Sequence, residues 1–298
     1  RLVPNLTPKG RQRFDLPGAL TLFTSLLALL LGLTLGQRLG FGEIRVLMLF
    51  VASLAFLAAF VTIELRSSQP MIELSLFRNT LFSINLVTGL ATFVSMGGTI
   101  ILMPFYLENV LGYGTRQVGL LMATIPLALS VVAPISGALS DRVGTRPITV
   151  LGLLAMVLGF LGMTTLGPET TTLGYILRFL PVGVGMGIFQ SPNNSAVMGA
   201  VPRERLGVAS GLLSITRTLG QTMGIAVLGA LWASRVFFHA GVAAAAGATA
   251  APAADQVAGL QDTFLVVVGL LAVALSLSLW GLVKERHLQR KAASRAKA

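Results

Sequence analysis

The residues with the most chemistry to offer are polar side chains set inside long apolar runs. Arg217 stands eleven residues into the run 206–234, which is otherwise free of charge. An arginine at the centre of a membrane helix costs about 2.5–3.5 kcal/mol to insert, so we expect this side chain to face protein or water. It is either a gate or substrate contact at a seam between two domains, or a structural tie to carbonyls or to a partner outside this sequence. Arg178 lies near the start of another run, where its long side chain can reach an interface.

Uncharged polar residues also recur at spacings of three and four, which places them on single helical faces. The three stripes are Asn85, Thr88, Thr92, Ser95 and Thr99; Gly183, Gly187, Gln190 and Asn194, with Asn193 beside them; and Ser210, Ser214, Arg217 and Gln221. Such stripes predict either a shared water-accessible cavity or hydrogen bonds between helices. Hydrogen bonding is favoured for the Ser- and Thr-rich first stripe taken alone, and a cavity for the second. The candidate cavity or substrate residues are Asn85, Thr88, Thr92, Gln190, Asn193 and Asn194.

The sequence has few other residues that could act as nucleophiles, metal ligands or acid–base groups. There is no cysteine, the two histidines are His239 and His287, and all acidic residues lie in predicted loops, tails or helix ends. An integral-membrane enzyme would need a metal cluster, a buried acid–base pair or an activated nucleophile. We therefore predict no catalytic residues and no metal ligands. A carboxylate for proton coupling is also missing from the helix centres, and Glu108 comes closest to that role.

The elements that carry these residues follow from composition. The 298 residues are 54% hydrophobic and 11% charged, whereas soluble domains carry about 25% charged residues. A soluble globular fold is therefore excluded. A membrane-spanning helix needs about 20 mostly apolar residues, and eight runs qualify. They are 16–37, 46–63, 79–107, 117–140, 147–168, 173–198, 206–234 and 263–283. The predicted fold class is an all-α integral membrane protein with eight transmembrane helices.

Orientation follows from the basic residues outside these runs. Sixteen Lys and Arg residues lie on the side of the two termini and four on the other side. The excess predicts a multi-pass protein of the plasma membrane with both termini in the cytoplasm. It also explains the net charge of +11 without any nucleic-acid partner. The segment 235–262, rich in Ala and Gly, is expected to be a flexible loop on the outer face with a frayed helical turn at most.

Small residues and prolines inside the runs indicate close packing or bends. The pairs Gly207/Gly211 and Gly220/Gly224 are spaced one helical turn apart, and Pro126 and Pro134 interrupt the run 117–140. Close helix–helix contact is the expected role of the glycines, with bending as a second possibility.

One turn carries a specific sequence signature. Between the fourth and fifth runs the chain reads Gly137-Ala-Leu-Ser-Asp141-Arg142-Val-Gly144-Thr-Arg146. Gly137 allows close helix contact, Gly144 permits an unusual backbone angle, and Asp141 can cap the next helix. Arg142 and Arg146 can pair with carboxylates or cap carbonyl ends. We expect this charge cluster to act as an inner-loop gate; the alternative is a basic turn that only sets topology.

The ten residues resemble the G-x-L-x-D-R-x-G-x-R loop of the major facilitator superfamily. Two further stretches agree with it: 178–187 is similar to the R-x-x-x-G-x-G pattern of the fourth helix of a half, and 217–224 resembles the R-x-L-G-x-x-x-G of drug exporters. Leu76-Phe-Arg-Asn79 and the preceding hairpin resemble the fourteen-helix drug:proton antiporter branch. That resemblance implies a basic cytoplasmic arm (1–15), a linker transmembrane hairpin (16–65), a cytoplasmic loop (66–79), a C-terminal six-helix half (80–283) and a basic cytoplasmic tail (284–298).

The resemblance also implies a function. In this superfamily the first and fourth helices of each half line a central cavity, which corresponds to 79–107 and 173–198 here. A member of this branch exports small lipophilic or cationic compounds by alternating access, driven by the proton gradient with no other cofactor. The partners implied are the lipid bilayer and a missing N-terminal six-helix half, so we expect the chain to be a piece of a longer protein. The alternatives are transport of another small solute, a non-transporting fragment or scaffold, and a twelve-helix arrangement.

Overall fold

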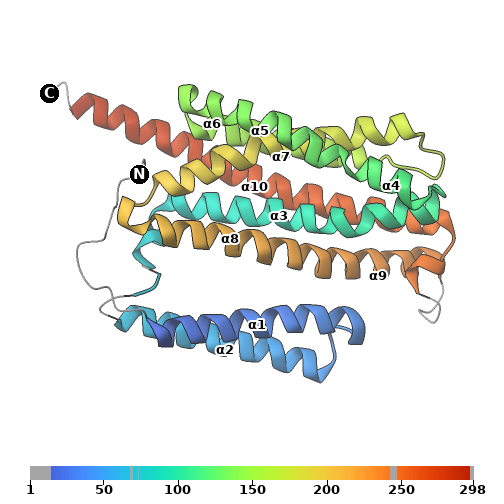
Figure 1. Ribbon diagram of the computed structural model, residues 1–298, viewed down its shortest axis with the longest axis horizontal. Coiled ribbons are helices and arrows are strands. Elements are labelled where there is room, and N and C mark those ends of the chain that lie inside the picture. The colour runs from blue at the N-terminus through green and yellow to red at the C-terminus, as the bar shows by residue number, and fades with distance from the viewer. Residues whose placement is uncertain (1–14, 68–69, 73, 242–246, 296–298) are drawn as a thin grey trace, which may run out of the picture.

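The computed structural model describes residues 15–67, 70–72, 74–241 and 247–295, without the side chains of 37, 38 and 286–295. The predicted arm 1–15 therefore lies outside the described residues except for Asp15, which accepts a hydrogen bond from Gly18 N (2.9 Å) and caps the first helix. The described part is helical and contains no strand (Figure 1).

Eight helical segments in the described residues are long and apolar enough to cross a membrane, which confirms the predicted fold class. The α-helices are α1 (Leu16–Leu39), α2 (Ile44–Arg66), α3 (Thr80–Phe105), α4 (Thr115–Met122), α5 (Thr124–Val143), α6 (Thr145–Met163), α7 (Thr172–Gly199), α8 (Leu206–Met223), α9 (Gly229–Ala240) and α10 (Ala253–Arg295). Short 3₁₀ helices are η1 (Leu74–Arg78), η3 (Arg203–Arg205) and η6 (Ala248–Ala250). Two π-helical turns, η2 (Tyr106–Val110) and η4 (Gly224–Leu228), extend α3 and join α8 to α9.

The run predicted as one helix over 117–140 consists of two helices. α4 ends at Met122 and α5 begins at Thr124, with Ala123 between them. Pro126 lies in the first turn of α5 and has no N–H to donate to the carbonyl four residues earlier. A proline is tolerated in a first turn, where those N–H groups have no helical partner, so the break falls just before it.

The flexible loop predicted over 235–262 is also corrected. α9 continues to Ala240, and α10 begins at Ala253, ten residues earlier than the apolar run suggested. Alanine has the highest helix propensity, so an alanine-rich segment extends a neighbouring helix readily. Gln256 strengthens this start because its Nε2 donates to the carbonyls of Thr249 (3.1 Å) and Ala251 (2.7 Å). Residues 242–246, the centre of the predicted loop, lie outside the description.

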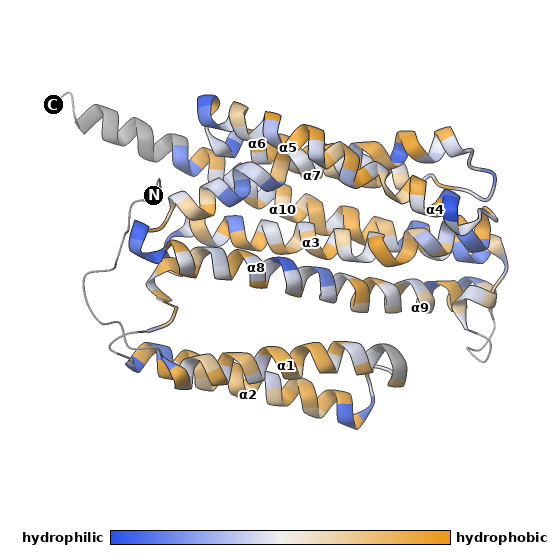
Figure 2. Cartoon of the chain, viewed as in Figure 1, coloured by the Kyte–Doolittle hydropathy of each residue, from blue (hydrophilic) through white to orange (hydrophobic). Residues whose placement is uncertain are grey.

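The helices form a hairpin and a six-span bundle. α1 and α2 pack against each other, and Ser25 Oγ in α1 donates to Ser53 O in α2 (2.9 Å). In the bundle, α7 packs between α5 and α6, while α3 contacts α8, η4 and α10. The hairpin lies alongside α8 and α9 (Figure 1) and meets the bundle at α8 and η4. Figure 2 shows mainly hydrophobic helices with hydrophilic residues at their ends and a hydrophilic stretch within α8.

Two ends of the bundle are distinguished by their contacts. At the motif end, which holds the turn 137–146, Lys284 Nζ donates to Thr80 Oγ1 (2.9 Å) and so ties the end of the last span to the start of α3. At the far end, Tyr106 Oη donates to Gly167 O (2.8 Å) and Gln261 Nε2 donates to Leu166 O (2.7 Å). These bonds fix the α6–α7 connection against α3 and α10.

Candidate functional site

The signature turn connects α5 to α6 at a single residue. Gly144 ends α5 and precedes α6 with φ of 91°, which agrees with the expected unusual backbone angle. Gly137 allows close contact with α7, because a Cβ added there would lie 2.9 Å from Ser191 Oγ. Asp141 does not cap the next helix: no side chain caps α6, since the chain re-enters a helix at once and leaves Asp141 in the last turn of α5. Asp141 and Arg142 are exposed.

Arg146 is the buried member of this turn. Only 6% of its side chain is exposed, and its Nε lies 2.5 Å from Glu285 Oε2 in α10. Its Nη2 also donates to Leu81 O at the start of α3 (3.4 Å). Arg146 therefore pairs with a carboxylate and bonds a carbonyl end, as the sequence suggested, and it links three helices at the motif end. Glu285 was missed because it was assigned to the tail; the available signal was that it is the first carboxylate after the last apolar run.

A polar hollow of about 360 Å³ surrounds this ion pair. Asn79 and Asn85 of the α3 region, Arg146 of α6, Ser195 of α7 and Glu285 of α10 line it. The structure thus brings one predicted cavity residue, Asn85, together with one predicted gating residue. Thr88, Thr92, Gln190, Asn193 and Asn194 do not line this hollow.

The polar stripe of α3 is buried inside the chain. Asn85, Thr88 and Thr92 are at most 4% exposed, and Ser95 and Thr99 are equally buried. The hydroxyls bond to carbonyls of their own helix: Thr92 Oγ1 donates to Thr88 O (2.8 Å), and Ser95 Oγ to Ala91 O (2.9 Å). These bonds satisfy the two hydroxyls within α3 itself. The hydrogen bonds between helices that were expected for this stripe are therefore not found for these hydroxyls. A cavity role for Thr88 and Thr92 stays a prediction.

The stripe of α7 divides into two parts. Gly183 and Gly187 pack against α5, where added Cβ atoms would lie 2.9 Å from Ile125 Cα and from Val132 Cβ. Gln190 and Asn194 are half-buried. Asn193 is 2% exposed, and its Oδ1 has no hydrogen-bond partner among the described residues. Its Nδ2 faces Gly89 of α3, 3.4 Å from where a Cβ would lie, so it occupies the α3–α7 crossing. A buried amide oxygen without a partner is costly, which makes Asn193 the best-placed candidate to meet a polar ligand or water.

The stripe of α8 faces outward. Ser210, Ser214 and Arg217 are all exposed, and Gln221 is half-buried. Arg217 therefore projects from near the middle of a 38-residue span onto a surface that the described residues do not cover. Arg178 lies instead near the far end of α7, where Nε donates to Thr165 Oγ1 (2.8 Å) and Nη1 to Gly174 O (3.0 Å). That Arg178 reaches a membrane interface stays a prediction.

Glycines let α3 pack closely against α8 and η4. A Cβ on Gly224 would overlap the carbonyl oxygen of Val94, and a Cβ on Gly97 would overlap that of Gln221. Gly220 also lies close to α3, because a Cβ added there would be 2.6 Å from Phe93 Cβ and 3.0 Å from Leu90 O. The predicted close approach is thus confirmed for Gly220 and Gly224. No described helix approaches Gly207 or Gly211, where an added Cβ would meet nothing within 4 Å, so for these two glycines it stays a prediction.

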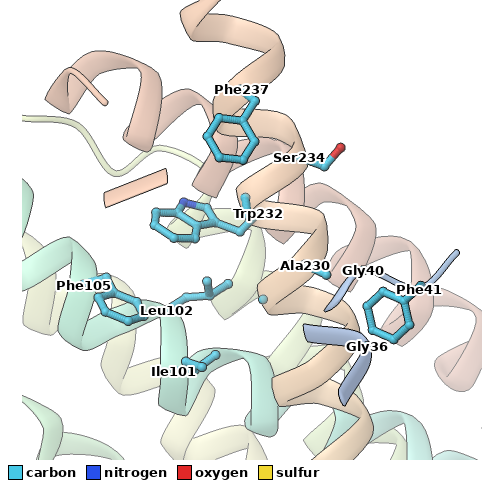
Figure 3. Close-up of a pocket in the computed structure, with 12 residues that line it drawn as sticks. Gly36, Gly40, Phe41, Ile101, Leu102, Phe105, Ala230, Trp232, Ser234 and Phe237 are labelled. Carbon is cyan, nitrogen blue, oxygen red and sulfur yellow. The ribbon is translucent and has the colours of Figure 1, made fainter. Parts of the chain in front are cut away.

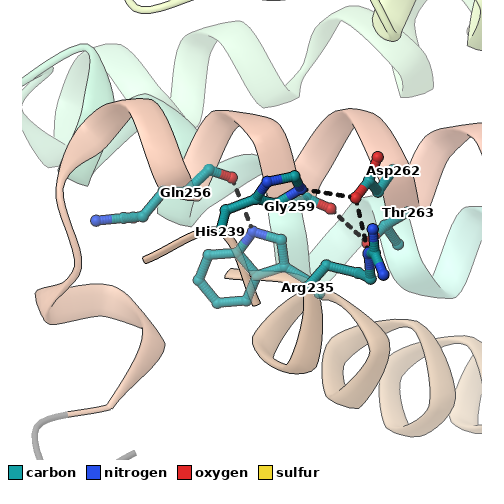
Figure 4. A network of polar contacts seen from close by, with 7 residues as sticks. Arg235, His239, Gln256, Gly259, Asp262 and Thr263 are labelled. Atoms are coloured by element: carbon teal, nitrogen blue, oxygen red, sulfur yellow. Dashed lines mark hydrogen bonds and ion pairs between the residues drawn. The ribbon is translucent and has the colours of Figure 1, made fainter. Parts of the chain in front are cut away.

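A polar network at the far end was not foreseen from the sequence (Figure 4). Asp262 of α10 accepts from Arg235 Nε (2.7 Å) and lies 2.8 Å from His239 Nε2, both on α9. Arg235 also stands 4.6 Å above the ring of Phe238. The three groups were assigned to a flexible loop, which hid their convergence. Their pairing closes α9 onto α10; within the described residues no three His, Asp or Glu side chains gather as metal ligands would.

Sequence comparison shows which known proteins this chain resembles. The sequence profile described as Major Facilitator Superfamily matches residues 5–225. The chain is 35% identical over 231 residues to the uncharacterized transporter YebQ of Escherichia coli, covering 76% of this chain and 50% of YebQ. It is 32% identical to the multidrug resistance protein Stp of Mycobacterium tuberculosis, covering 75% of this chain and 41% of Stp.

A third relative carries a different name. The riboflavin transporter RibZ of Clostridioides difficile is 30% identical, covering 76% of this chain and 48% of RibZ. The chain therefore spans about half the length of the curated relatives that it matches.

Proposed function

The chain belongs to the major facilitator superfamily, and from that membership we propose that it forms the linker hairpin and C-terminal six-helix half of a proton-coupled multidrug exporter. It is a multi-pass membrane protein. In the proposal the full-length protein exports small lipophilic or cationic compounds by alternating access, with the proton gradient as its energy source and no cofactor. The name of Stp, a multidrug resistance protein, supports the substrate class.

The observation that carries the proposal is the exposed Arg217 in mid-span. A charged side chain at this depth must face protein or water, because lipid exposure would cost several kcal/mol. The same face carries Ser210 and Ser214. We infer that the missing six-helix half faces this surface across a water-filled path, and that Asn85, Gln190, Asn193 and Asn194 belong to the cavity.

The proposal also gives the signature turn a role. Asp141 and Arg142 are exposed at the motif end, beside the ion pair between the buried Arg146 and the half-buried Glu285. In the proposed cycle, Arg146 keeps the ends of α3, α6 and α10 together as one rigid unit. Asp141 and Arg142 then contact the other half when the motif end is shut. The motif end and both termini are proposed to lie in the cytoplasm, following the excess of basic residues there.

Transport tests Arg217 directly. Cells that express the full-length protein with Arg217→Ala should extrude ethidium about tenfold more slowly than wild type, the size expected from losing one charged hydrogen bond of about 1.5 kcal/mol. Arg203→Ala, a change at an exposed arginine in η3 just before α8, should leave efflux unchanged. Dye efflux is followed by fluorescence at matched expression, with and without a protonophore. Wild-type efflux by Arg217→Ala would remove this residue from the mechanism.

Orientation is tested by labelling. The sequence contains no cysteine, so single cysteines introduced at exposed positions report their side without interference from this part of the chain. Cysteine at Arg142 should react with a membrane-impermeant maleimide only after the cells are permeabilised, and cysteine at the exposed Glu169 should react in intact cells. The reverse pattern would place the motif end outside the cell.

A second candidate is transport of another small solute. The relative named riboflavin transporter supports it, since its identity to this chain is similar to that of Stp. The same cells distinguish the two: protonophore-sensitive efflux of ethidium or tetracycline supports the first proposal. Riboflavin uptake without dye efflux would support the second.

A further inference from the structure

An apolar cavity of about 540 Å³ lies at the far end, between the hairpin and the bundle (Figure 3). Phe41 follows α1, Ile101 and Phe105 lie on α3, and Trp232, Ala233 and Phe237 lie on α9. None of the described side chains that line it is charged, and Ser234 contributes the only hydroxyl among them. The cavity volume falls within the range of about 300–1,000 Å³ that small-molecule sites occupy.

The walls of this cavity are fixed by their own contacts. Trp232 is 7% exposed, and its ring stacks on Phe105 with centroids 5.7 Å apart and an interplanar angle of 1°. Its indole N–H donates to Gln256 O (3.2 Å), so this polar atom is paired with α10. The ring of Phe41 lies over Gly36, where a Cβ would come within 2.5 Å of it. The cavity is therefore preformed and presents ring faces and aliphatic carbon.

The surroundings decide what can fill it. A buried water needs two to four polar partners, which the described side chains of this lining do not supply. An empty space would forfeit dispersion contacts on every wall. Exposed apolar side chains are adjacent in sequence to the lining residues: Leu39 is 48%, Ile100 47% and Phe238 70% exposed. In a chain with eight membrane-spanning segments, the molecules available to an apolar opening of this kind are bilayer lipids.

We propose that this cavity binds an acyl chain of a membrane phospholipid. The hairpin meets the bundle at α8 and η4, and the acyl chain fills the space that remains beyond these contacts at the far end. The lipid chain becomes part of the interface between α1, α3 and α9. This site is independent of what the protein transports.

Tryptophan fluorescence tests the site, because the sequence has two tryptophans in contrasting positions. Trp280 is 52% exposed on α10, whereas Trp232 is 7% exposed. Two versions of the full-length protein are reconstituted in phosphatidylcholine brominated at defined acyl positions. One keeps only Trp232 and the other only Trp280, with every other tryptophan replaced by phenylalanine. Bromine quenches by contact, so a buried Trp232 should be quenched as strongly as Trp280 if an acyl chain enters the cavity.

A substitution that fills the cavity provides a second test of the proposal. Ala233→Phe in the protein that keeps only Trp232 should lose most of the quenching. Ala58→Phe, at an exposed position of α2 that does not line the cavity, should lose none. Both variants are compared by gel filtration before use. If Ala233→Phe fails to fold, the comparison of Trp232 with Trp280 alone still tests the proposal.

The overturning results are equally specific. Trp232 that escapes brominated lipid while Trp280 is quenched would show that lipid does not enter. Quenching of Trp232 by iodide from the water phase, in place of brominated lipid, would show a hydrated crevice. Full quenching retained in a folded Ala233→Phe protein would show that bromine reaches the indole by another route.

Discussion

Gly224→Ala is expected to lower the free energy of unfolding by about 3 kcal/mol or more. The new methyl group would overlap the carbonyl oxygen of Val94 and lie 2.9 Å from the backbone nitrogen of Gly98. Both neighbours are backbone atoms, so no side-chain rotation can relieve the overlap. α3 and η4 must move apart, which disturbs the buried polar stripe of α3. An SDS titration of the purified full-length protein in mixed micelles measures the change.

Gly211→Ala is the matched control on the same span. A Cβ at Gly211 meets nothing within 4 Å, and alanine is the better helix former. This variant should be as stable as wild type or slightly more so. Equal stability of Gly224→Ala and wild type would contradict the tight crossing of α3 with η4.

Removing the partner of Arg146 should have an effect of similar size. Glu285→Ala leaves a guanidinium that is 6% exposed without its carboxylate, and breaking a buried ion pair in this way costs about 3–5 kcal/mol. The lower end is expected here, because Glu285 is itself 34% exposed. The free energy of unfolding of the full-length protein, measured as above, reports the loss.

A double variant separates the pair from the packing. Arg146→Met combined with Glu285→Leu removes both charges and keeps the volume, so most of the lost stability should return. Arg142→Met changes an exposed arginine of the same turn and should leave stability unchanged. If the double variant is no more stable than Glu285→Ala, the ion pair is not the source of the loss.

The spans and the signature turn were predictable because their causes are local. Eight apolar runs correspond to eight spans, since the length of a spanning helix is set by the bilayer and read directly from charge-free sequence. The φ of 91° at Gly144 was predictable for the same reason, because a tight turn between two helices needs a residue without a Cβ.

The features that sequence reasoning missed depend on contacts between distant segments. Nothing near Glu285 indicates that Arg146, on another helix, would accept it as a partner. Asp262, Arg235 and His239 look like the charged edges of a loose loop until α9 and α10 are placed side by side. The sequence also did not show which polar stripe would be exposed. The stripes of α3 and α8 have similar spacing, yet the first is buried and the second faces outward.

The π-turn η4 has a consequence for the whole span that contains it. Its wider i→i+5 bonding takes up one more residue than an α-turn, which rotates everything after it by about 100°. Before it, Ser210, Ser214 and Arg217 are exposed; after it, Leu228, Trp232 and Val236 continue the same numerical spacing but are buried. Positions at the same spacing are thereby polar and exposed over the first half of this span, and apolar and packed inside the bundle over the second half. The one extra residue in η4 therefore lets a single span turn two different faces toward the bundle, one before the π-turn and one after it.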